Sequence, residues 1–99
     1  MQIRFTTLAQ NELAEARRWL NRQQPGLGRQ LNEEVRQVAA RMIRMPFLYP
    51  LETKEVRKCS LTRFHYNLRF YIQEEVIFVI AFSHQHRDPH YWVDRLPNQ

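Results

Sequence analysis

The residues best suited to chemistry lie close together near the C-terminal end of the sequence. Residues 83–95 read SHQHRDPHYWVDR, in which histidine, arginine and tyrosine are unusually dense. RNA cleavage needs a group that activates the 2′-hydroxyl, a cation beside the phosphate and an acid for the leaving oxygen. His84, Arg87 and Tyr91 are the right types for these roles. The same side chains also suit binding of a phosphodiester backbone, stacking on a base, or docking of an acidic protein.

Other kinds of site find little support. His84 and His86 would share one face of a strand, as metal ligands can, but neither a cysteine pair nor an HExxH motif accompanies them. Cys59, the single cysteine, has no glycine-rich elbow and is predicted to be a small buried hydrophobe. Glycine occurs only at positions 26 and 28, which excludes Walker and dinucleotide-binding loops. The sequence therefore predicts neither a metal site nor a cofactor.

Cationic residues from two expected strands extend the candidate set. If those strands are neighbours, their side chains and those of residues 83–95, the tail, converge on one side of the sheet and form a target-binding surface. The alternative is a scattered set of solvated charges. The candidate target-binding residues are Arg57, Lys58, Arg63, His65, Arg69, His84, His86, Arg87 and Tyr91. Two tail residues are predicted to be structural, because Trp92 would cap the core and Asp88 would cap a last helical turn over residues 89–95.

Composition limits the class of protein. The 99 residues suffice for one domain over residues 1–99, and a net charge of +5 favours association with polyanions or acidic proteins. One cysteine fits a reducing compartment. The N-terminus lacks the apolar region of a secretory signal, and the longest apolar run, residues 76–82, is too short to span a membrane. We therefore expect a soluble cytoplasmic protein that does not act at membranes.

The first half of the chain predicts a strand and two helices that would position these residues. Residues 2–5 read as a short opening strand, and Thr7 followed three residues later by Gln10 has the form of a capping box. The helix after it ends where Pro25-Gly26 breaks the pattern. A second helix with a sustained apolar stripe runs from about residue 27 to 45, where Pro46 stops it. Two helices joined by so short a break should pack as an antiparallel hairpin.

The second half changes to the period of a strand. After a loop over residues 47–55, residues 56–61 form a strand of mixed polarity, and residues 66–72 alternate as a strand with one buried face does. Residues 73–75 form a turn, and residues 76–82 are apolar on both faces, so both should be covered. The order predicts an α+β fold: an N-terminal strand, an antiparallel helical hairpin and a three-stranded antiparallel run that completes one sheet.

Several segments, taken in order, resemble the RelE/ParE superfamily of toxins from bacterial type II toxin–antitoxin systems. Residues 81–92, with Arg95 after them, resemble its C-terminal signature, in which a buried strand runs into a His…Arg-Asp-Pro…Trp segment. Trp19-Leu20, Pro25-Gly-Leu-Gly28, Tyr49-Pro50 and residues 61–70 (LTRFHYNLRF) agree with its earlier parts. The resemblance covers nearly the whole chain, and it departs from the pattern at His65, where the family's turn carries proline.

The resemblance implies a helical hairpin on an antiparallel sheet, an antitoxin encoded alongside and a cytoplasmic target. RelE-like members cleave mRNA on the ribosome with a cluster of basic residues and often a C-terminal tyrosine. ParE-like members lack that set and poison DNA gyrase. This chain keeps Lys58 and Tyr91, whereas the counterparts of other basic positions are the uncharged Ser60, Asn67 and Gln85. The ParE-like branch is therefore favoured.

We accordingly expect a toxin that inhibits growth by binding DNA gyrase and is not an enzyme. Two alternatives stay open: a metal-independent, ribosome-dependent mRNA endoribonuclease, and an attenuated relative that only binds antitoxin. The nuclease would use Lys58, His84, Arg87 and Tyr91, with His65 as a further candidate. The expected partners are a cognate acidic antitoxin, gyrase or the ribosome with its mRNA, and operator DNA only through the antitoxin complex. The antitoxin should cover the helical hairpin, the tail surface or both.

Overall fold

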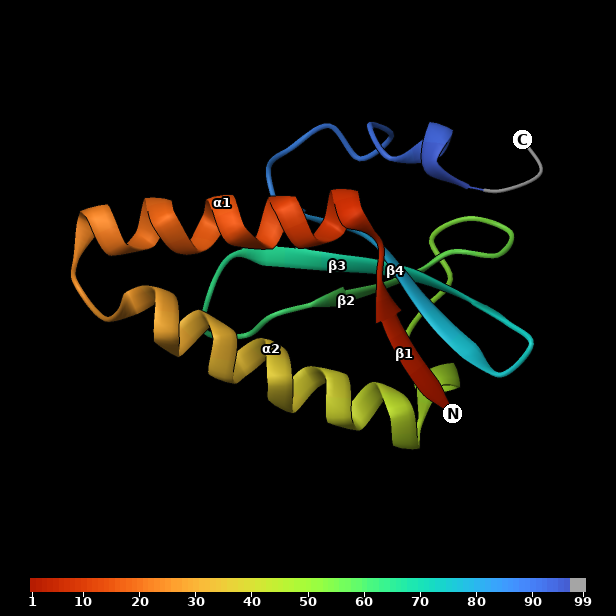
Figure 1. Cartoon of the computed structure of the whole chain (residues 1–99). Helices are drawn as coiled ribbons and strands as arrows, with labels where there is room; N and C mark the ends of the chain where they lie inside the picture. Colours follow the sequence, from red (N-terminus) through yellow and green to blue (C-terminus); the bar gives the residue numbers. More distant parts are fainter. Residues whose placement is uncertain (97–99) are drawn as a thin grey trace.

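The computed structural model describes residues 1–96, whose elements follow the expected order of one strand, two helices and three strands (Figure 1). The elements are β1 (Gln2–Phe5), α1 (Thr7–Gln23), α2 (Leu27–Arg44), the short 3-10 helix η1 (Pro46–Leu48), β2 (Arg57–Ser60), β3 (Tyr66–Gln73), β4 (Val76–His84) and the 3-10 helix η2 (Val93–Arg95). The predicted α+β class is confirmed, including the helical hairpin and the antiparallel run of β2, β3 and β4.

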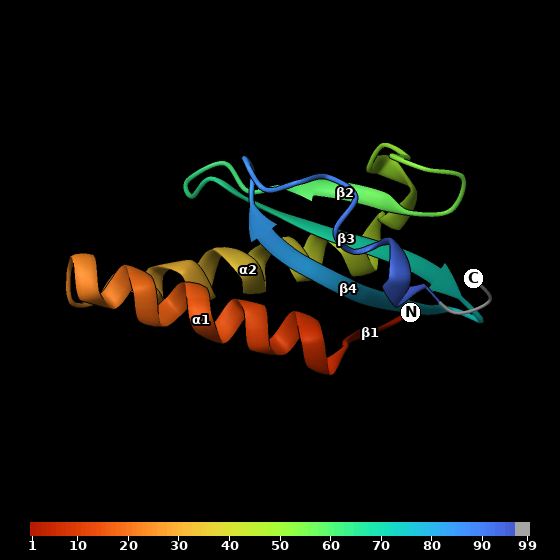
Figure 2. The same ribbon diagram turned by 90° about the horizontal axis from the view of Figure 1, so that it is seen from above.

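The strands form one mixed sheet in the order β1-β4-β3-β2. β1 pairs in parallel with β4, the last strand of the chain, so that Gln2 lies opposite Val76. Figure 2 shows the two helices along one side of the sheet, with the tail that follows β4 passing over β3 and β4. Residues of β4 pack against the helices on one face and against Trp92 of the tail on the other. This double cover explains why residues 76–82 are apolar on both faces, as predicted.

Helix α1 begins at a different cap from the one predicted. Its N-cap is Thr6, whose hydroxyl accepts a hydrogen bond from the Ala9 amide at 3.2 Å. The capping box expected at Thr7 and Gln10 is wrong, because the extended backbone that leaves β1 reaches Thr6 and makes Thr7 the first helical residue. The Gln10 side chain instead donates to the Phe5 carbonyl at 2.8 Å.

The turn between the helices depends on its two glycines. Gly26 has a φ of 96°, a left-handed value that favours glycine. Gly28 sits where the helices approach each other: its N–H donates to Asn21 Oδ1 at 2.9 Å, and a Cβ would lie 2.8 Å from Asn21 Nδ2. The predicted break at Pro25-Gly26 is confirmed, and α2 ends at Arg44, one residue before the predicted end.

A bulge in β4 builds the core on the tail side. The register between β3 and β4 shifts between Arg69 and Phe70, where Ile80 is the extra residue. As a result Ile80 and the adjacent Ala81 both pack against Trp92, together with Val56. Trp92 is buried, which confirms its predicted role as a cap of the core, and the burial of Cys59 is confirmed as well.

The loops and the tail contain smaller differences from the sequence-based expectations. The predicted loop after α2 begins with the 3-10 helix η1, and the strand expected over residues 56–61 covers only Arg57–Ser60. The helical turn expected over residues 89–95 is confined to Val93–Arg95, because Asp88 Oδ1 caps a local turn instead, accepting from the His90 N–H at 2.9 Å. Over residues 1–96, none of the helices has the length and apolar character needed to cross a membrane.

Candidate functional site

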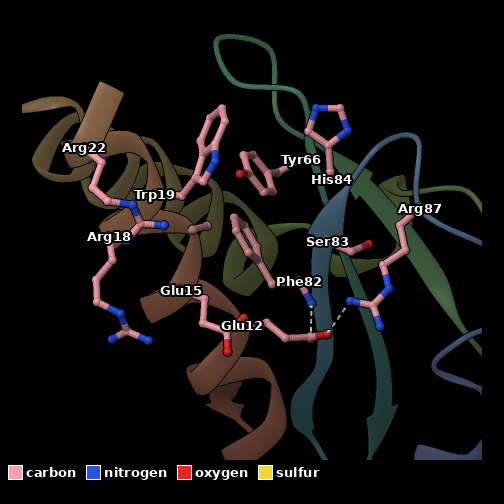
Figure 3. A pocket seen from close by; sticks show the side chains of 11 residues that line it. Glu12, Glu15, Arg18, Trp19, Arg22, Tyr66, Phe82, Ser83, His84 and Arg87 are labelled. Carbon is pink, nitrogen blue, oxygen red and sulfur yellow. Dashed lines mark hydrogen bonds and ion pairs between the residues drawn. The ribbon is translucent and has the colours of Figure 1, made fainter. Parts of the chain in front are cut away.

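A cleft of about 370 Å³ lies between the second half of α1 and the ends of β3 and β4 (Figure 3). Trp19 of α1 stands at its rim and is 49% exposed, which is unusual for so large an apolar side chain. Figure 3 shows Trp19 facing Tyr66 of β3 and His84 at the end of β4. Phe82 forms the buried base below them. The helix and the strand ends thus present an aromatic surface to solvent.

The aromatic rings are held in place by one another. Tyr66 stacks on Phe82 with ring centroids 5.0 Å apart and planes 7° from parallel, and His84 meets Tyr66 edge-on at 5.5 Å. His86 and His65 lie on either side of His84, with ring centroids at 5.1 and 6.5 Å. The Nδ1 atom of His84 accepts the His86 N–H at 3.2 Å, which leaves Nε2 for a partner.

Guanidinium groups surround the aromatic surface. Figure 3 shows Arg18 and Arg22 on one side of the cleft and Arg87 on the other. Within residues 1–96, neither Arg18 nor Arg22 makes a salt bridge, and Glu15 is an exposed carboxylate beside them. The rim is therefore rich in positive charge, which suits an acidic or polyanionic partner.

Glu12, at the bottom of the cleft, connects α1, β4 and the tail. It accepts the Phe82 backbone N–H at 2.9 Å and two hydrogen bonds from Arg95, at 2.7 and 3.1 Å. Arg87 lies 3.8 Å from its second oxygen (Figure 3). Because bidentate arginine–carboxylate pairs are strong and directional, Glu12 fixes the path of the tail over the sheet.

Replacing Glu12 by alanine should therefore loosen the tail. The Phe82 amide would lose its acceptor, and the Arg95 guanidinium would lose its carboxylate partner and keep only the Ile80 carbonyl. Both groups are largely buried, so we expect a loss of about 2 kcal/mol in the free energy of unfolding. Urea denaturation measures this loss. Glu15→Ala, one turn away and exposed, is the matched control and should change stability by less than about 0.5 kcal/mol. Equal effects of the two variants would contradict the assigned role of Glu12.

The Tyr91 ring is contacted by two arginines. The Arg87 guanidinium lies 3.8 Å above the ring and that of Arg95 lies at 4.9 Å. Its hydroxyl oxygen is buried and has no hydrogen-bond partner among the described residues. Burial raises the pKa of the Tyr91 hydroxyl above its ordinary value. A buried hydroxyl with a raised pKa is poorly placed for contact with a phosphate or for proton transfer at neutral pH.

Arg69 lies on the face of the sheet that the tail covers, and its side chain is buried. Its Nε and Nη2 atoms donate to the Glu52 carboxylate at 2.6 and 3.1 Å, and its guanidinium lies 5.6 Å from the Trp92 ring. The pKa of Glu52 is lowered, chiefly by the hydrogen bond from Arg69. Lys58 is opposite Arg69 in the β2–β3 ladder, so it points to this same face and is partly exposed.

The other predicted cations serve local structure. Arg57 Nη1 donates to the carbonyls of Phe47 and Tyr49, at 3.4 and 2.7 Å. Arg63 donates to the Gln30 side chain and lies over the Phe64 ring. His65 is exposed in the connection between β2 and β3.

The expected convergence of all these residues on one side of the sheet is wrong. Strand side chains alternate between faces, and the ladder puts Lys58 with Arg69 on the tail side. His84, two strands away and opposite Tyr66, belongs to the helix side. From strand spacing and rise, Lys58 and His84 are roughly 14 Å apart along the sheet. The structure brings His65 and His86 beside His84, which lines the cleft together with Arg87, and leaves the strand arginines elsewhere.

Sequence reasoning missed the residues of α1 that complete the cleft. Arg18, Trp19 and Arg22 were not candidates, although Trp19 lies beside Leu20, outside the stripe of Ala9, Ala16 and Leu20 that is buried. A tryptophan outside the apolar stripe of an amphipathic helix was the available signal. Tyr66 was treated only as part of the alternating strand expected over residues 66–72.

Comparisons with known proteins agree with this fold. The family model "ParE toxin of type II toxin-antitoxin system, parDE" matches residues 3–89. The solved structure "Chromosomal ParDE TA system from P. aeruginosa" is similar with a TM-score of 0.75 and 15% identity, over 85% of this chain and 95% of that one. No curated protein matches the chain. ParE toxins pair with a ParD antitoxin, and the expected resemblance is confirmed and narrowed to its ParE branch. The chain belongs to the ParE toxin family of type II toxin–antitoxin systems.

Proposed function

We propose that this chain is a toxin that inhibits DNA gyrase by binding it through the Trp19–His84 cleft, and that a ParD antitoxin neutralises it. The choice of gyrase rests on the resemblance to ParE-like toxins, which poison DNA gyrase. The observation that carries the use of the cleft is the half-exposed Trp19, which faces Tyr66 and His84 between flanking arginines. Exposed tryptophan and arginine side chains are the residue types that dominate protein–protein binding energy.

Ribonuclease chemistry has less support. A nuclease must gather base, cation and acid around one phosphate. Of the four residues expected for that role, Lys58 and His84 point to opposite faces of the sheet, and the Tyr91 hydroxyl is buried. Binding without cleavage requires no such convergence, so it is the function that this geometry favours.

The remaining parts of the proposal follow from the family. We place the toxin in the cytoplasm as a single domain, with no cofactor, and we assign contact with operator DNA to the complex with antitoxin. An acidic antitoxin suits a chain with a net charge of +5. Of the predicted target-binding residues, His65, His84, His86 and Arg87 are kept in the proposed surface. Arg57, Lys58, Arg63, Arg69 and Tyr91 are left out of it.

The test is inhibition of purified gyrase, together with expression of the chain without antitoxin. We expect growth arrest, loss of negative supercoiling and intact transcripts. Cleaved transcripts on translating ribosomes with normal supercoiling would replace the proposal by the endoribonuclease. Unchanged growth would leave an attenuated relative that only binds antitoxin.

Trp19→Ala tests the cleft itself. Loss of a central aromatic anchor should raise the concentration for half-inhibition of supercoiling about 30-fold. Leu8→Ala, which changes a similarly exposed residue of α1 outside the cleft, is the matched control and should stay within about 3-fold of the parent. Tyr91→Phe should also keep inhibition, because its hydroxyl is buried. Equal inhibition by the Trp19 variant and the parent would exclude the cleft as the gyrase-binding site.

A further inference from the structure

The end of α2 and the segment after it form the second unusual surface of the molecule. Five large apolar side chains between positions 43 and 51 are exposed. They are Ile43 (37%), Met45 (53%), Phe47 (66%), Leu48 (69%) and Leu51 (53%). Single exposed apolar residues are ordinary, but a run of this density marks an interaction surface. We call these five residues the η1 patch.

The η1 patch is displayed by a segment that is firmly held. Pro46 of this segment is buried, and the Tyr49 ring packs edge-on against Phe70 at 5.8 Å. Arg57 donates to two carbonyls of the segment and lies 5.2 Å from the Phe47 ring. The Lys58 amide donates to the Pro50 carbonyl at 3.1 Å. Since the backbone is already fixed, a partner would dock on the patch without the entropic cost of ordering it.

The charged side chains of residues 41–52 are positive apart from Glu52, whose carboxylate is paired with Arg69. Residues 41–51 (RMIRMPFLYPL) contain two arginines and no carboxylate, and Arg57 lies against Phe47. A second copy of the chain would bring the same arginines together across a two-fold axis, which is unfavourable. A segment with apolar anchors and flanking Asp or Glu residues complements the patch in both respects.

We infer that the η1 patch is the docking site of an amphipathic, acidic segment of the antitoxin. The inference rests on the proposed function for the existence of that partner, and it adds where the partner binds. Figure 1 shows η1 at the end of α2 remote from the α1–α2 turn, near which Trp19 lies. At 1.5 Å per residue along α2, the two surfaces are roughly 20 Å apart. Antitoxin capture and target binding are thus anchored on separate surfaces.

The experiment uses the full chain, with the purified ParD antitoxin from its own operon as the probe. In the double variant Phe47→Ser/Leu48→Ser, antitoxin affinity should fall at least about 100-fold, because two exposed anchors are lost. Leu8→Ser is the matched control, since it removes an exposed leucine from α1 outside the patch, and its affinity should stay within about 3-fold. Arg44→Glu should weaken binding most at low salt, because a rim charge is screened by ions.

The decisive result is a double variant that still arrests growth and is no longer rescued by co-expressed antitoxin. Retained toxicity also shows that the variant is folded; should it fail to fold, Leu48→Arg removes the most exposed anchor alone. Rescue and affinity equal to the parent would overturn the inference while leaving the proposed toxin intact. Loss of a parent homodimer, with antitoxin binding unchanged, would assign the patch to a second copy and likewise overturn it. A parent that binds no antitoxin would refute the proposed partnership, and this inference with it.

Discussion

Replacing Trp92 by alanine is expected to lower the free energy of unfolding by about 3–5 kcal/mol, the range for large aromatic residues in a core. Trp92 is only 1% exposed and is the centre of the small core formed with Val56, Ile80 and Ala81. Among residues 85–96 it is the only one that is fully buried. For a domain of ordinary stability, about 5–15 kcal/mol, this is a large fraction of the total. Urea denaturation followed by far-UV circular dichroism measures it.

Trp92→Phe is the matched control, because it keeps a ring in the core. The Trp92 Nε1 atom is buried and has no hydrogen-bond partner within residues 1–96, so phenylalanine removes an unsatisfied donor as well as volume. The two effects oppose each other, and the net loss should be about 1 kcal/mol. In the alanine variant, trypsin should cut after Arg87 well before the rest of the chain. A stable alanine variant with a protease-resistant tail would contradict the role given to Trp92.

Much of the architecture was readable from local pattern. The apolar stripe of α2 and the Pro-Gly break specify the hairpin, because period and backbone restriction act within a few residues. The two-faced apolar character of residues 76–82 identified a strand covered on both sides. The burial of Trp92 followed from size alone. Each of these features depends on neighbours in sequence, which is why it was predictable.

What escaped prediction depends on contacts between distant residues. Glu12 bonds to partners 70 and 83 positions later, and nothing in its own segment indicates this. The bulge at Ile80 and the left-handed backbone of Glu74 and Glu75 in the β3–β4 turn lack the glycine or asparagine that usually marks such sites. The cleft escaped for the same reason, because Trp19 and Tyr66 meet only once α1 lies across the sheet.

The cationic strand residues show that residue type alone does not predict whether a side chain is exposed. Arg69 and Lys58 are equivalent as sequence signals, yet they differ in exposure by their strand position. Lys58 lies on the edge strand β2 and is partly exposed. Arg69 lies on the inner strand β3, where Trp92 of the tail covers it, and is buried. A buried guanidinium needs a carboxylate, and Glu52 in the preceding loop supplies it. The charge therefore stabilises the fold that carries the cleft instead of contacting a target.

Glu52→Ala should accordingly be among the most damaging single substitutions, with a loss of about 3–5 kcal/mol, because it leaves the Arg69 charge buried and unpaired. The side chain of Arg69 is 4% exposed and that of Glu52 is 21% exposed, so solvent replaces the lost carboxylate poorly. Adding Arg69→Met should restore much of the stability, since the pair then gives way to an apolar contact with Trp92. A double variant no more stable than Glu52→Ala would show that the ion pair is not the cause.

The same pair predicts a pH dependence. The pKa of Glu52 in the folded chain is below its ordinary value of 4.5, chiefly because Arg69 donates to the carboxylate. The contribution of Glu52 to the free energy of unfolding is thus complete above about pH 5. It is lost as the pH falls below 4.5 through the folded pKa. The pKa of Glu34, which accepts hydrogen bonds from the Thr62 and Arg63 amides, is also lowered in the folded state. Its contribution to stability is lost over the same pH range, so the pH dependence of the parent alone does not separate Glu52 from Glu34. The difference in unfolding free energy between the parent and Glu52→Gln isolates Glu52, and it should shrink as the pH is lowered from 5 to 3. A difference independent of pH would mean that the charge of Glu52 does not stabilise the fold.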